Sequence, residues 1–542
     1  ASDVEMNLSN TNATNLFGAS SPTIIGTDYK TFMLYLSRLQ VNQSVNLDNS
    51  NDAYNQLEIS NSSIDNNNSN TISGTQSGQT AVAQENLTTT RASVTLNNNG
   101  TITLSGVNST GMYAKFGVIN NNSTGVITIG DSSTALYGTS DSIMTNTGKI
   151  TIGSNSTGMY SEGSTTTNLV NAGTIETSGN GSIGLLYKSG AIATANDMLV
   201  NTGIINMTGD QNVALYGTNM SGVTSTYGIS NSGTITMGNS SSINNPNVAL
   251  YADGDTKSVS NSGTITMGAN TIGMYGHEAS VTGGSLTVGD GGVGIYSQSK
   301  DVTLSGGTIT VGGNEAVGVY TVGSGQNIIN SGTTIHLGDT SFGFVNVGTG
   351  NSIISSLTNN TLGTNSIYIY SNDSSGRVIN STNLTSTGDQ NYGIYSAGTV
   401  NNSGNMDLSS GIGNVGIYSV GGGTATNTAT ISVGASNTVN NLYGIGMAAG
   451  YTTTDTGNIV NNGTINVNGT NSIGMYATGS GSTVTNNNTI NLNANNTTGI
   501  FLDNGATGIN NGTITTGSSS GLSNVVGVHL GKDSVLVNSS SG

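Results

Sequence analysis

The chain has 542 residues, of which only 7% are charged and 81 are Gly, and its formal net charge is −17. Its ten basic residues are scattered singly, so the sequence holds no basic stripe for nucleic acid or an anionic membrane surface. No apolar run approaches the roughly 20 residues of a membrane-spanning helix, so this segment is not expected to be membrane-inserted.

Residues 1–54 differ in pattern from the rest of the chain, and we expect them to form an N-terminal cap. An amphipathic helix is predicted around residues 28–40, because apolar residues recur there at helical spacing. These residues are Phe32, Tyr35, Leu36 and Leu39. A stack of repeats leaves unpaired edge groups at its open end, which a cap would cover; a partner-binding or oligomerisation segment is the alternative. Residues 55–98 are predicted to form irregular first coils.

Residues 99–542 repeat one phrase, in which Gly-Thr-Ile is followed by Gly, an apolar residue (Φ) and Tyr. The copies end at Tyr113, Tyr137, Tyr160, Tyr187, Tyr216, Tyr251, Tyr275, Tyr296, Tyr320, Val345, Tyr370, Tyr395, Tyr418, Gly446, Tyr476, Phe501 and His529. The first and last of these positions are 416 residues and sixteen steps apart, so the mean period is 26. A period in this range is typical of a stacked solenoid.

Alternation of side chains identifies the strands within each repeat. In residues 233–238, Ile235 and Met237 fall on one face and the Thr residues on the other, which is the pattern of a half-buried strand. Three short strands with three corners fit one turn of a solenoid. We therefore predict an all-β fold, a parallel β-helix of about 17 or more coils, whose right-handed sense is implied by the family resemblance given below. The last repeat stops at residues 537–539, so we expect truncation at the C-terminus.

A Gly-Asp pair recurs six residues before the Tyr position. The acidic residues are Asp131, Asp210, Asp290, Asp339 and Asp389. Stacked carboxylates could form an oxygen cage for calcium. The alternative is an Asx turn, in which the side chain bonds the backbone two residues on. The five Asp never fall in adjacent coils, which favours the Asx turn, because a shared cage would need them together.

Carbohydrate-active enzymes also occur on β-helices, and their chemistry needs paired carboxylates or clustered Asp beside a base. Asp253, Asp255 and Lys257 fall together, as do Lys300 and Asp301. Neither group has a repeated partner, and both fit solvated corners. The three His residues fall in different coils, which argues against a shared metal site. The sequence therefore predicts no catalytic residue, no metal and no cofactor, and the protein is not expected to be an enzyme.

The Tyr positions are predicted to form a column along one side of the stack. If Met274 points inward, Gly273 and Tyr275 point outward, and the Tyr ring covers its small neighbour. The column is either a packed ladder that stiffens the stack or an exposed platform, since Tyr is enriched in binding hot spots. As a platform, its candidate ligand-binding residues are Tyr187, Tyr216, Tyr251 and Tyr275.

Insertions between repeats give a second candidate surface, because loops are the places where a repeating surface becomes unique. They fall at residues 189–199, 217–228, 239–247 and 448–458. The first three lie in consecutive coils and could form one patch. Within it, the candidate ligand-binding residues are Asn219, Met220 and Tyr227, which can supply contact area or hydrogen bonds. Solvated loops that merely tolerate insertion are the alternative.

The iterated phrase, as in residues 171–175 (Asn-Ala-Gly-Thr-Ile) and 415–418 (Val-Gly-Ile-Tyr), resembles the passenger repeats of the large fusobacterial type V autotransporter adhesins. The resemblance implies a right-handed β-helix at the bacterial cell surface, exported through an outer-membrane barrel of the same polypeptide beyond the C-terminus. It also implies partners such as a host cell-surface protein, a host glycan or other bacteria. The alternatives are a carbohydrate-active β-helix enzyme and a passive structural stalk. No family binding residue can be carried over, because the repeat itself is scaffold.

Overall fold

The computed structural model of the chain describes residues 5–7, 38–41, 44–48, 57–60, 63–85, 95–140, 142–162, 169–188, 199–218, 228–253, 258–516 and 521–539. The chain divides into two compact units. The first comprises residues 1–267 and 274–277, and the second comprises residues 268–273 and 278–542. The regular secondary structure of the described ranges is β-strand, with no helix among them.

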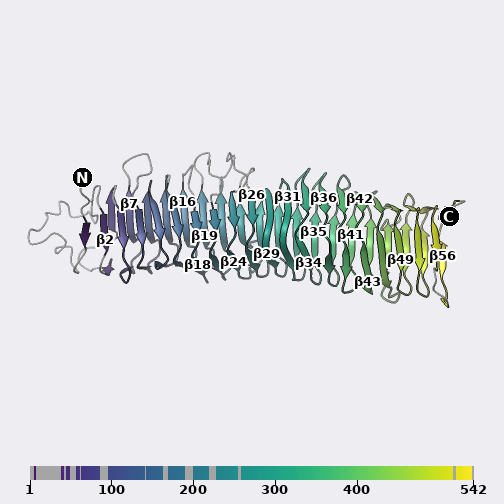
Figure 1. Cartoon of the computed structure of the whole chain (residues 1–542), viewed down its shortest axis with the longest axis horizontal. Helices are drawn as coiled ribbons and strands as arrows, with labels where there is room; N and C mark the ends of the chain where they lie inside the picture. Colours follow the sequence, from purple (N-terminus) through teal and green to yellow (C-terminus); the bar gives the residue numbers. More distant parts are fainter. Residues whose placement is uncertain are drawn as a thin grey trace, which may run out of the picture. The chain divides into compact units, whose positions relative to one another are not determined.

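Each coil of the first unit contributes three strands, as in β10 (Thr110–Lys115), β11 (Val118–Asn121) and β12 (Val126–Ile129). The strands pair in parallel with their equivalents in adjacent coils; β10, for example, pairs with β7 (Thr80–Glu85) and β13 (Thr134–Thr139). The strands of each unit therefore lie side by side as stacked arrows (Figure 1). This arrangement confirms the predicted all-β parallel solenoid of the right-handed type.

The strands form three sheets, named here for a residue of the repeat. In the first unit the tyrosine sheet contains β4 (Leu57–Ser60), β7 (Thr80–Glu85), β10, β13 (Thr134–Thr139), β16 (Thr157–Glu162), β19 (Ile183–Lys188), β22 (Val213–Thr218) and β25 (Asn247–Ala252). The asparagine sheet contains β1 (Glu5–Asn7), β2 (Arg38–Val41), β5 (Ser63–Asn66), β8 (Thr95–Asn98), β11, β14 (Ile143–Asn146), β17 (Leu169–Asn171), β20 (Leu199–Asn201), β23 (Ile229–Asn231) and β26 (Ser258–Asn261). The threonine sheet contains β3 (Val45–Asn46), β6 (Thr71–Gly74), β9 (Thr101–Leu104), β12, β15 (Lys149–Ile152), β18 (Thr174–Thr177), β21 (Ile204–Met207), β24 (Thr234–Met237) and β27 (Thr264–Met267).

The second unit repeats the same plan. Its tyrosine sheet contains β30 (Val293–Ser297), β32 (Val317–Thr321), β35 (Phe342–Asn346), β38 (Ile367–Ser371), β41 (Tyr392–Ser396), β44 (Val415–Ser419), β47 (Ile445–Ala449), β50 (Ile473–Thr478), β53 (Thr498–Asp503) and β56 (Val526–Leu530). Its asparagine sheet contains β33 (Asn327–Asn330), β36 (Ser352–Ser355), β39 (Arg377–Asn380), β42 (Thr399–Asn402), β45 (Thr424–Asn427), β48 (Asn458–Asn461), β51 (Thr483–Asn486), β54 (Thr507–Asn510) and β57 (Val535–Asn538). Its threonine side is divided: β34 (Thr334–Leu337) pairs with β31 (Val302–Val311), and a separate sheet contains β37 (Asn360–Leu362), β40 (Leu384–Ser386), β43 (Met406–Ile412), β46 (Thr430–Ala435), β49 (Thr464–Val467), β52 (Thr489–Leu492) and β55 (Thr513–Thr515). The long strands β29 (Glu278–Val288) and β31 (Val302–Val311) supply both of the last two sheets, and β28 (Thr271–Gly276) is divided between the units.

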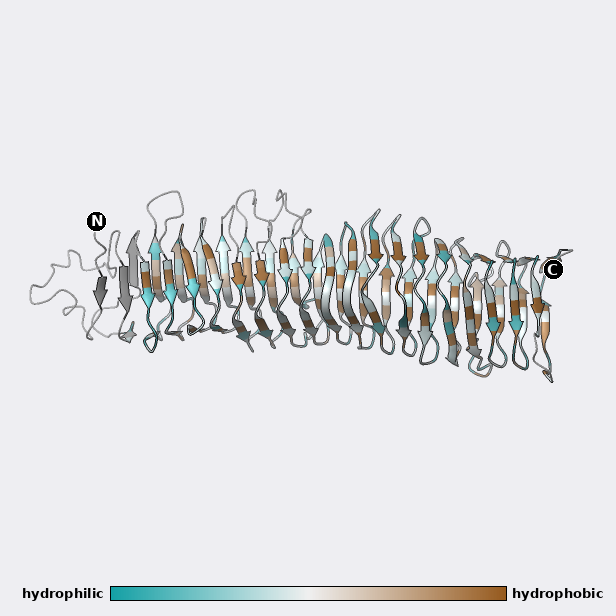
Figure 2. Ribbon diagram, viewed as in Figure 1, coloured by the Kyte–Doolittle hydropathy of each residue, from teal (hydrophilic) through white to brown (hydrophobic). Residues whose placement is uncertain are grey.

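The core is filled by columns of apolar side chains that recur once per coil. In the threonine sheet of the first unit, Ile127 lies in register with Ile102 and Ile150, and all three side chains are completely buried. Figure 2 shows hydrophobic and hydrophilic residues in alternation along the strands. The period-two pattern predicted for the Gly-Thr-Ile strands is thereby confirmed.

The Gly of the Gly-Φ-Tyr phrase faces the core, which corrects the prediction that it points outward beside Tyr. In β10, Gly111 and Met112 are both buried, while Tyr113 is half-buried. Met112 is paired with Leu136 of the next coil, but Gly111 is left out of the pairing. A Cβ on Gly111 would lie 2.5 Å from the carbonyl oxygen of Ala135. The irregular pairing turns two successive residues inward, so the Tyr ring does not cover the Gly.

A column of Asn side chains, all buried except Asn538, runs through the asparagine sheet of each unit. Each Asn donates from Nδ2 to the Oδ1 of the Asn one coil further on, at 2.7–2.8 Å in the first unit and 2.7–3.1 Å in the second. The two ladders comprise Asn66, Asn98, Asn121, Asn146, Asn171, Asn201, Asn231 and Asn261, and Asn380, Asn402, Asn427, Asn461, Asn486, Asn510 and Asn538. A buried amide is costly unless it is hydrogen-bonded, so these ladders fix the register of the coils.

In the second unit the Asn column is broken at Ser355, which lies in register with Asn330 and Asn380. Tyr368 fills the space: it occupies the Gly position of β38 and is completely buried. Its hydroxyl lies 2.7 Å from Ser355 Oγ, which in turn lies 2.7 Å from Thr382 Oγ1. The inward Tyr thus replaces the missing amide as the polar contact of that coil.

The predicted N-terminal helix is not confirmed. Residues 38–40, at its end, belong to strand β2, which pairs in parallel with β5. The remainder of residues 28–40 lies outside the described residues. At residues 38–40, backbone pairing with the next coil determines the structure, although the apolar side chains have helical spacing.

Candidate functional site

The tyrosine sheet of the first unit carries aromatic rings in register, at half-buried positions. The rings form two runs, one of Tyr113, Tyr137 and Tyr160 and one of Tyr216, Tyr251 and Tyr275. Neighbouring ring centroids within a run are 4.7–5.4 Å apart. The rings therefore pack on one another and also remain partly open to solvent, so the structure combines features of both the stiffening ladder and the platform.

Tyr187 does not belong to this column, which corrects the sequence-based alignment. Leu186 is the residue in register with Tyr160, and Tyr187 pairs with Ser161. Tyr187 is completely buried. The coil reads Gly-Leu-Leu-Tyr, with one extra residue before the Tyr, so counting along the repeat chose the wrong position. Tyr187 contributes to the core and is not a surface contact.

Burial raises the pKa of Tyr137, Tyr160 and Tyr251 from 10.0 to about 12, and the Glu162 carboxylate adds to the shift at the first two. The Tyr137 hydroxyl donates to Glu162 Oε2 at 3.2 Å. These phenols therefore stay protonated in the folded column at a pH where a free Tyr ionises.

Alkaline pH is consequently expected to destabilise the first unit. A folded pKa above the unfolded value gives stability that is complete below the unfolded pKa and is lost as pH rises through the folded pKa. The window here runs from 10.0 to about 12. Urea unfolding at about pH 9 and about pH 11.5 measures the loss. The combined Tyr137→Phe, Tyr160→Phe and Tyr251→Phe variant should lose less stability over this interval; an equally steep loss would show that other groups are responsible.

The structure describes the four insertions predicted from the sequence to different extents. Asn219, Met220 and Tyr227 lie outside the described residues, as do residues 189–198. The insertion at residues 239–247 is a turn held by hydrogen bonds: Ser240 Oγ donates to Asp210 Oδ1 at 2.6 Å. As a binding patch, the first three insertions remain a prediction. The fourth, at residues 448–458, borders a pocket.

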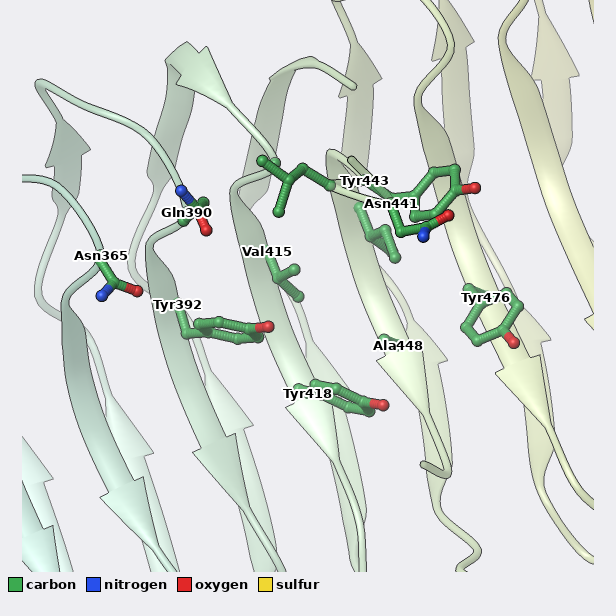
Figure 3. A pocket seen from close by; sticks show the side chains of 12 residues that line it. Asn365, Gln390, Tyr392, Val415, Tyr418, Asn441, Tyr443, Ala448 and Tyr476 are labelled. Atoms are coloured by element: carbon green, nitrogen blue, oxygen red, sulfur yellow. The ribbon is translucent and has the colours of Figure 1, made fainter. Parts of the chain in front are cut away.

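This pocket, of about 230 Å³, opens in the second unit where the Tyr column has a gap. Ala448 of β47 stands in register between Tyr418 and Tyr476, which corrects the prediction that Gly446 occupies this position. A second small residue, Gly413 (φ 73°), lies in the adjacent corner. Two missing side chains thus create a hollow between the rings of Tyr418 and Tyr476 (Figure 3).

Two loops border this part of the second unit. Residues 436–443 form a short hairpin closed by an antiparallel bridge between Asn437 and Leu442. The hairpin carries Val439 and Tyr443, which are 89% and 37% exposed. The second loop, residues 450–457, carries Tyr451, which is 69% exposed. Of these side chains, Tyr443 lines the pocket, and an exposed aromatic side chain at a hollow is typical of a recognition site.

The walls of the pocket are aromatic and uncharged. Tyr392, Tyr418 and Tyr476 line it, and burial raises the pKa of all three phenols. Tyr392 and Tyr418 lie nearly parallel, with an interplanar angle of 13°. The Tyr418 hydroxyl donates to the carbonyl oxygen of Gly450 at 3.0 Å, which holds its ring in place. The lining contains no Asp, Glu, Lys, Arg or His.

Three amide side chains complete the lining, namely Asn365, Gln390 and Asn441. In each of them the backbone takes the left-handed conformation, with φ of 55°, 58° and 56°. Asn365 and Gln390 lie at equivalent corners, whereas Asn441 lies in the hairpin. Within the described part of the chain, none of these amide side chains is engaged in a hydrogen bond. Their donors and acceptors are therefore available to a bound molecule.

Sequence reasoning did not find this pocket. Tyr392 and Tyr443 lie outside the Gly-Φ-Tyr position, and the step from Tyr418 to Gly446 is too close to the mean period to stand out as an insertion. The usable signal combines two departures: a small residue in the Tyr column at Ala448, and an extra Tyr two coils earlier at Tyr392, where the next two coils carry Val415 and Ile445. Recognising it required the true register at Ala448.

The repeated Asp side chains accept hydrogen bonds from backbone N–H groups of the next coil, which corrects the predicted Asx turn. The backbone N–H of Ser154 donates to Asp131 Oδ1 at 2.7 Å, and that of Thr364 donates to Asp339 Oδ1 at 2.8 Å. Both donors lie one coil further along the chain. The carboxylate turns toward the neighbouring coil because stacking brings an unpaired N–H to that corner.

The remaining candidates for chemistry are dispersed. Asp255 and Lys257 lie outside the described residues, and Asp301 accepts a hydrogen bond from the backbone N–H of Asn327 at 2.8 Å. Among the residues that the structure describes, no three His, Asp or Glu side chains lie close enough together to hold a metal ion. Nor does any helix in those ranges have the length and apolar character needed to cross a membrane.

Comparison with known proteins identifies one family. The model of the BigA third pectate lyase-like domain matches residues 7–230 and 408–513, together more than half of the chain. The second matched stretch includes Tyr418, Ala448 and Tyr476 of the pocket. No curated protein and no solved structure was found to match. On the strength of its family match and its solenoid fold, the chain belongs to the family of the BigA third pectate lyase-like domain.

Proposed function

We propose that the chain is the exposed passenger of a bacterial autotransporter-type adhesin, and that it acts by binding and not by catalysis. The observation that carries the proposal is the pocket of the second unit, whose lining offers rings and amides but no acid or base. The family match and the parallel solenoid support a passenger-type protein at the bacterial surface.

The repeat explains where a partner would be held. Coils stack by repeating the same contacts, so most of the surface offers a partner no unique feature. The pocket and its two loops, residues 436–443 and 450–457, depart from the repeat. A host cell-surface protein, a host glycan or a component of other bacteria is the proposed partner class.

Because the family is described as a pectate lyase-like domain, an enzyme is the main alternative to an adhesin. Cleavage of a glycosidic bond needs a pair of carboxylates, and lyase chemistry needs a base beside clustered acids. The lining of the pocket has neither, and its Tyr pKa values are raised, so these phenols are poor bases near neutral pH. The lining of the pocket therefore fits an adhesin better than an enzyme.

Purified chain, fluorescently labelled, would be incubated with cultured epithelial cells, with bacterial cells and with polygalacturonate. We expect saturable binding to cells and no release of unsaturated product from the polymer. Combining Tyr418→Ala with Tyr476→Ala should reduce cell binding at least fivefold, because both pocket walls are lost. The matched control is Tyr113→Ala, in the column of the first unit, with less than a twofold effect.

Three results would overturn the proposal. Cleavage of polygalacturonate would make the chain an enzyme. Absence of binding to every cell type would leave a passive stalk. An equal loss of binding in Tyr113→Ala would show that the pocket is not the contact surface.

A further inference from the structure

The pocket arises where several departures from the repeat meet. In the Tyr column Ala448 replaces a ring, and in the adjoining corner Gly413 replaces the amide that Asn365 and Gln390 supply in the two preceding coils. At the start of its strand, Tyr392 replaces the aliphatic residue of the register neighbours Ile367 and Val415. Stacking requires none of these changes. Positions that depart from the repeat without stabilising the stack are expected to be functional.

We infer that this pocket binds a single neutral pyranose ring of a glycan, an inference that rests on the proposed function and names its ligand class. Size is the first argument. The hollow of about 230 Å³ is smaller than the roughly 300–1,000 Å³ that holds a drug-sized ligand. A space of this size accommodates one six-membered ring, with the rest of the chain outside.

The aromatic wall matches one face of such a ring. A pyranose has flat patches of C–H groups that pack on aromatic faces, and Tyr392, Tyr418 and Tyr476 supply those faces. Figure 3 shows the three rings in a row, with Gln390 and Asn441 above them. A ligand between them would contact rings on one side and amides on the other.

The amides match the hydroxyl groups of a sugar. Each hydroxyl both donates and accepts, and each free amide offers two donors and an acceptor. The side chains of Asn365, Gln390 and Asn441 provide three such groups at the pocket. No backbone segment has to move to expose them, so binding would need little reorganisation.

The charge of the site selects a neutral ligand. No cation lines the pocket to hold a carboxylate, a phosphate or a sialic acid. The carboxylates closest in sequence to the lining and its loops are already committed to backbone N–H groups: Asp389 accepts from Ile412 at 2.7 Å and Asp455 accepts from Gly421 at 2.7 Å. A quaternary ammonium ion, the other ligand of aromatic cages, would find no free anion in the lining.

The test uses the purified chain and methyl glycosides of galactose, glucose, mannose, fucose, N-acetylglucosamine and N-acetylgalactosamine. Galacturonate, sialic acid and phosphocholine serve as charged probes. Binding is measured by saturation-transfer NMR and titration calorimetry. We expect at least one neutral glycoside to bind, and each charged probe to bind at least tenfold more weakly than that glycoside.

Filling the gap is the decisive change. Ala448→Tyr restores the side chain that the column carries elsewhere, and should lower glycoside affinity at least tenfold while leaving the circular dichroism spectrum unchanged. The matched control is Val345→Tyr, which fills another gap in the same column, between Tyr320 and Tyr370, and should change affinity less than twofold. Tyr392→Val, which restores the residue of the next coil, is a second disabling variant and should lower affinity at least fivefold.

The inference fails if no neutral glycoside binds, if a charged probe binds best, or if Ala448→Tyr binds as the wild type does. Cell binding measured in parallel separates it from the proposed function. Binding to cells without binding to any glycoside would defeat the sugar pocket and leave the adhesin standing. Absence of cell binding would defeat the adhesin, and glycoside binding lost in Ala448→Tyr would still support the pocket.

Discussion

Replacing Tyr368 with Ala is expected to lower the free energy of unfolding of the second unit by about 3–5 kcal/mol, the usual cost of deleting a large buried ring. The side chain is completely buried, and no solvent can fill the apolar part of the space it leaves. Its hydroxyl also lies 2.7 Å from Ser355 Oγ, at the point where the Asn column is broken. Both the packing and the polar contact of this coil are lost together.

Two further variants separate these contributions. Tyr368→Phe keeps the ring and removes the hydroxyl, so it should cost only about 1 kcal/mol, because Ser355 retains its contact with Thr382. Tyr451→Ala removes a Tyr that is 69% exposed and should change stability by less than about 0.5 kcal/mol. Urea unfolding followed by far-ultraviolet circular dichroism measures all three. Similar effects of Tyr368→Ala and Tyr451→Ala would mean that Tyr368 does not lie in the core.

The fold could be predicted from the sequence because a regular repeat of this length is typical of a stacked solenoid. Ile235 and Met237 alternate with Thr, and the same alternation returns in every coil, so strand type and parallel stacking follow together. The exact register could not be read in the same way. A single extra residue at Leu186 moves Tyr187 from surface to core, and counting by period does not reveal it.

The Asn ladder shows a different limit of sequence reasoning. The Asn of Asn-x-Gly-Thr-Ile looks like a turn residue, since Asn is favoured in turns for its own backbone contacts. Its buried position and its partner one coil away appear only when the coils are stacked. The pocket at Ala448 is hidden for the same reason, because its lining comes from successive coils that no local pattern links.

Replacing Asn201 with Ala is expected to cost about 2–4 kcal/mol, because a buried polar group left without a partner costs about 1–3 kcal/mol. Asn171 Nδ2 donates to Asn201 Oδ1, and Asn201 Nδ2 donates to Asn231 Oδ1, each at 2.8 Å. The substitution removes both bonds at once. Asn171 keeps weaker contacts with two carbonyl oxygens at 3.3 Å, whereas the Asn231 Oδ1 loses its donor from the ladder.

The matched control is Asn206→Ala, the same substitution on the exposed face of β21 in the same coil. It should change the free energy of unfolding by less than about 0.5 kcal/mol, as exposed substitutions usually do. Hydrogen exchange of the amides in β20 and β23 adds a local measurement, since coils contact only their neighbours and the damage should stay near the broken ladder. If Asn201→Ala and Asn206→Ala are equally mild, the ladder is not what holds the coils in register, and the stacked apolar columns must do so alone.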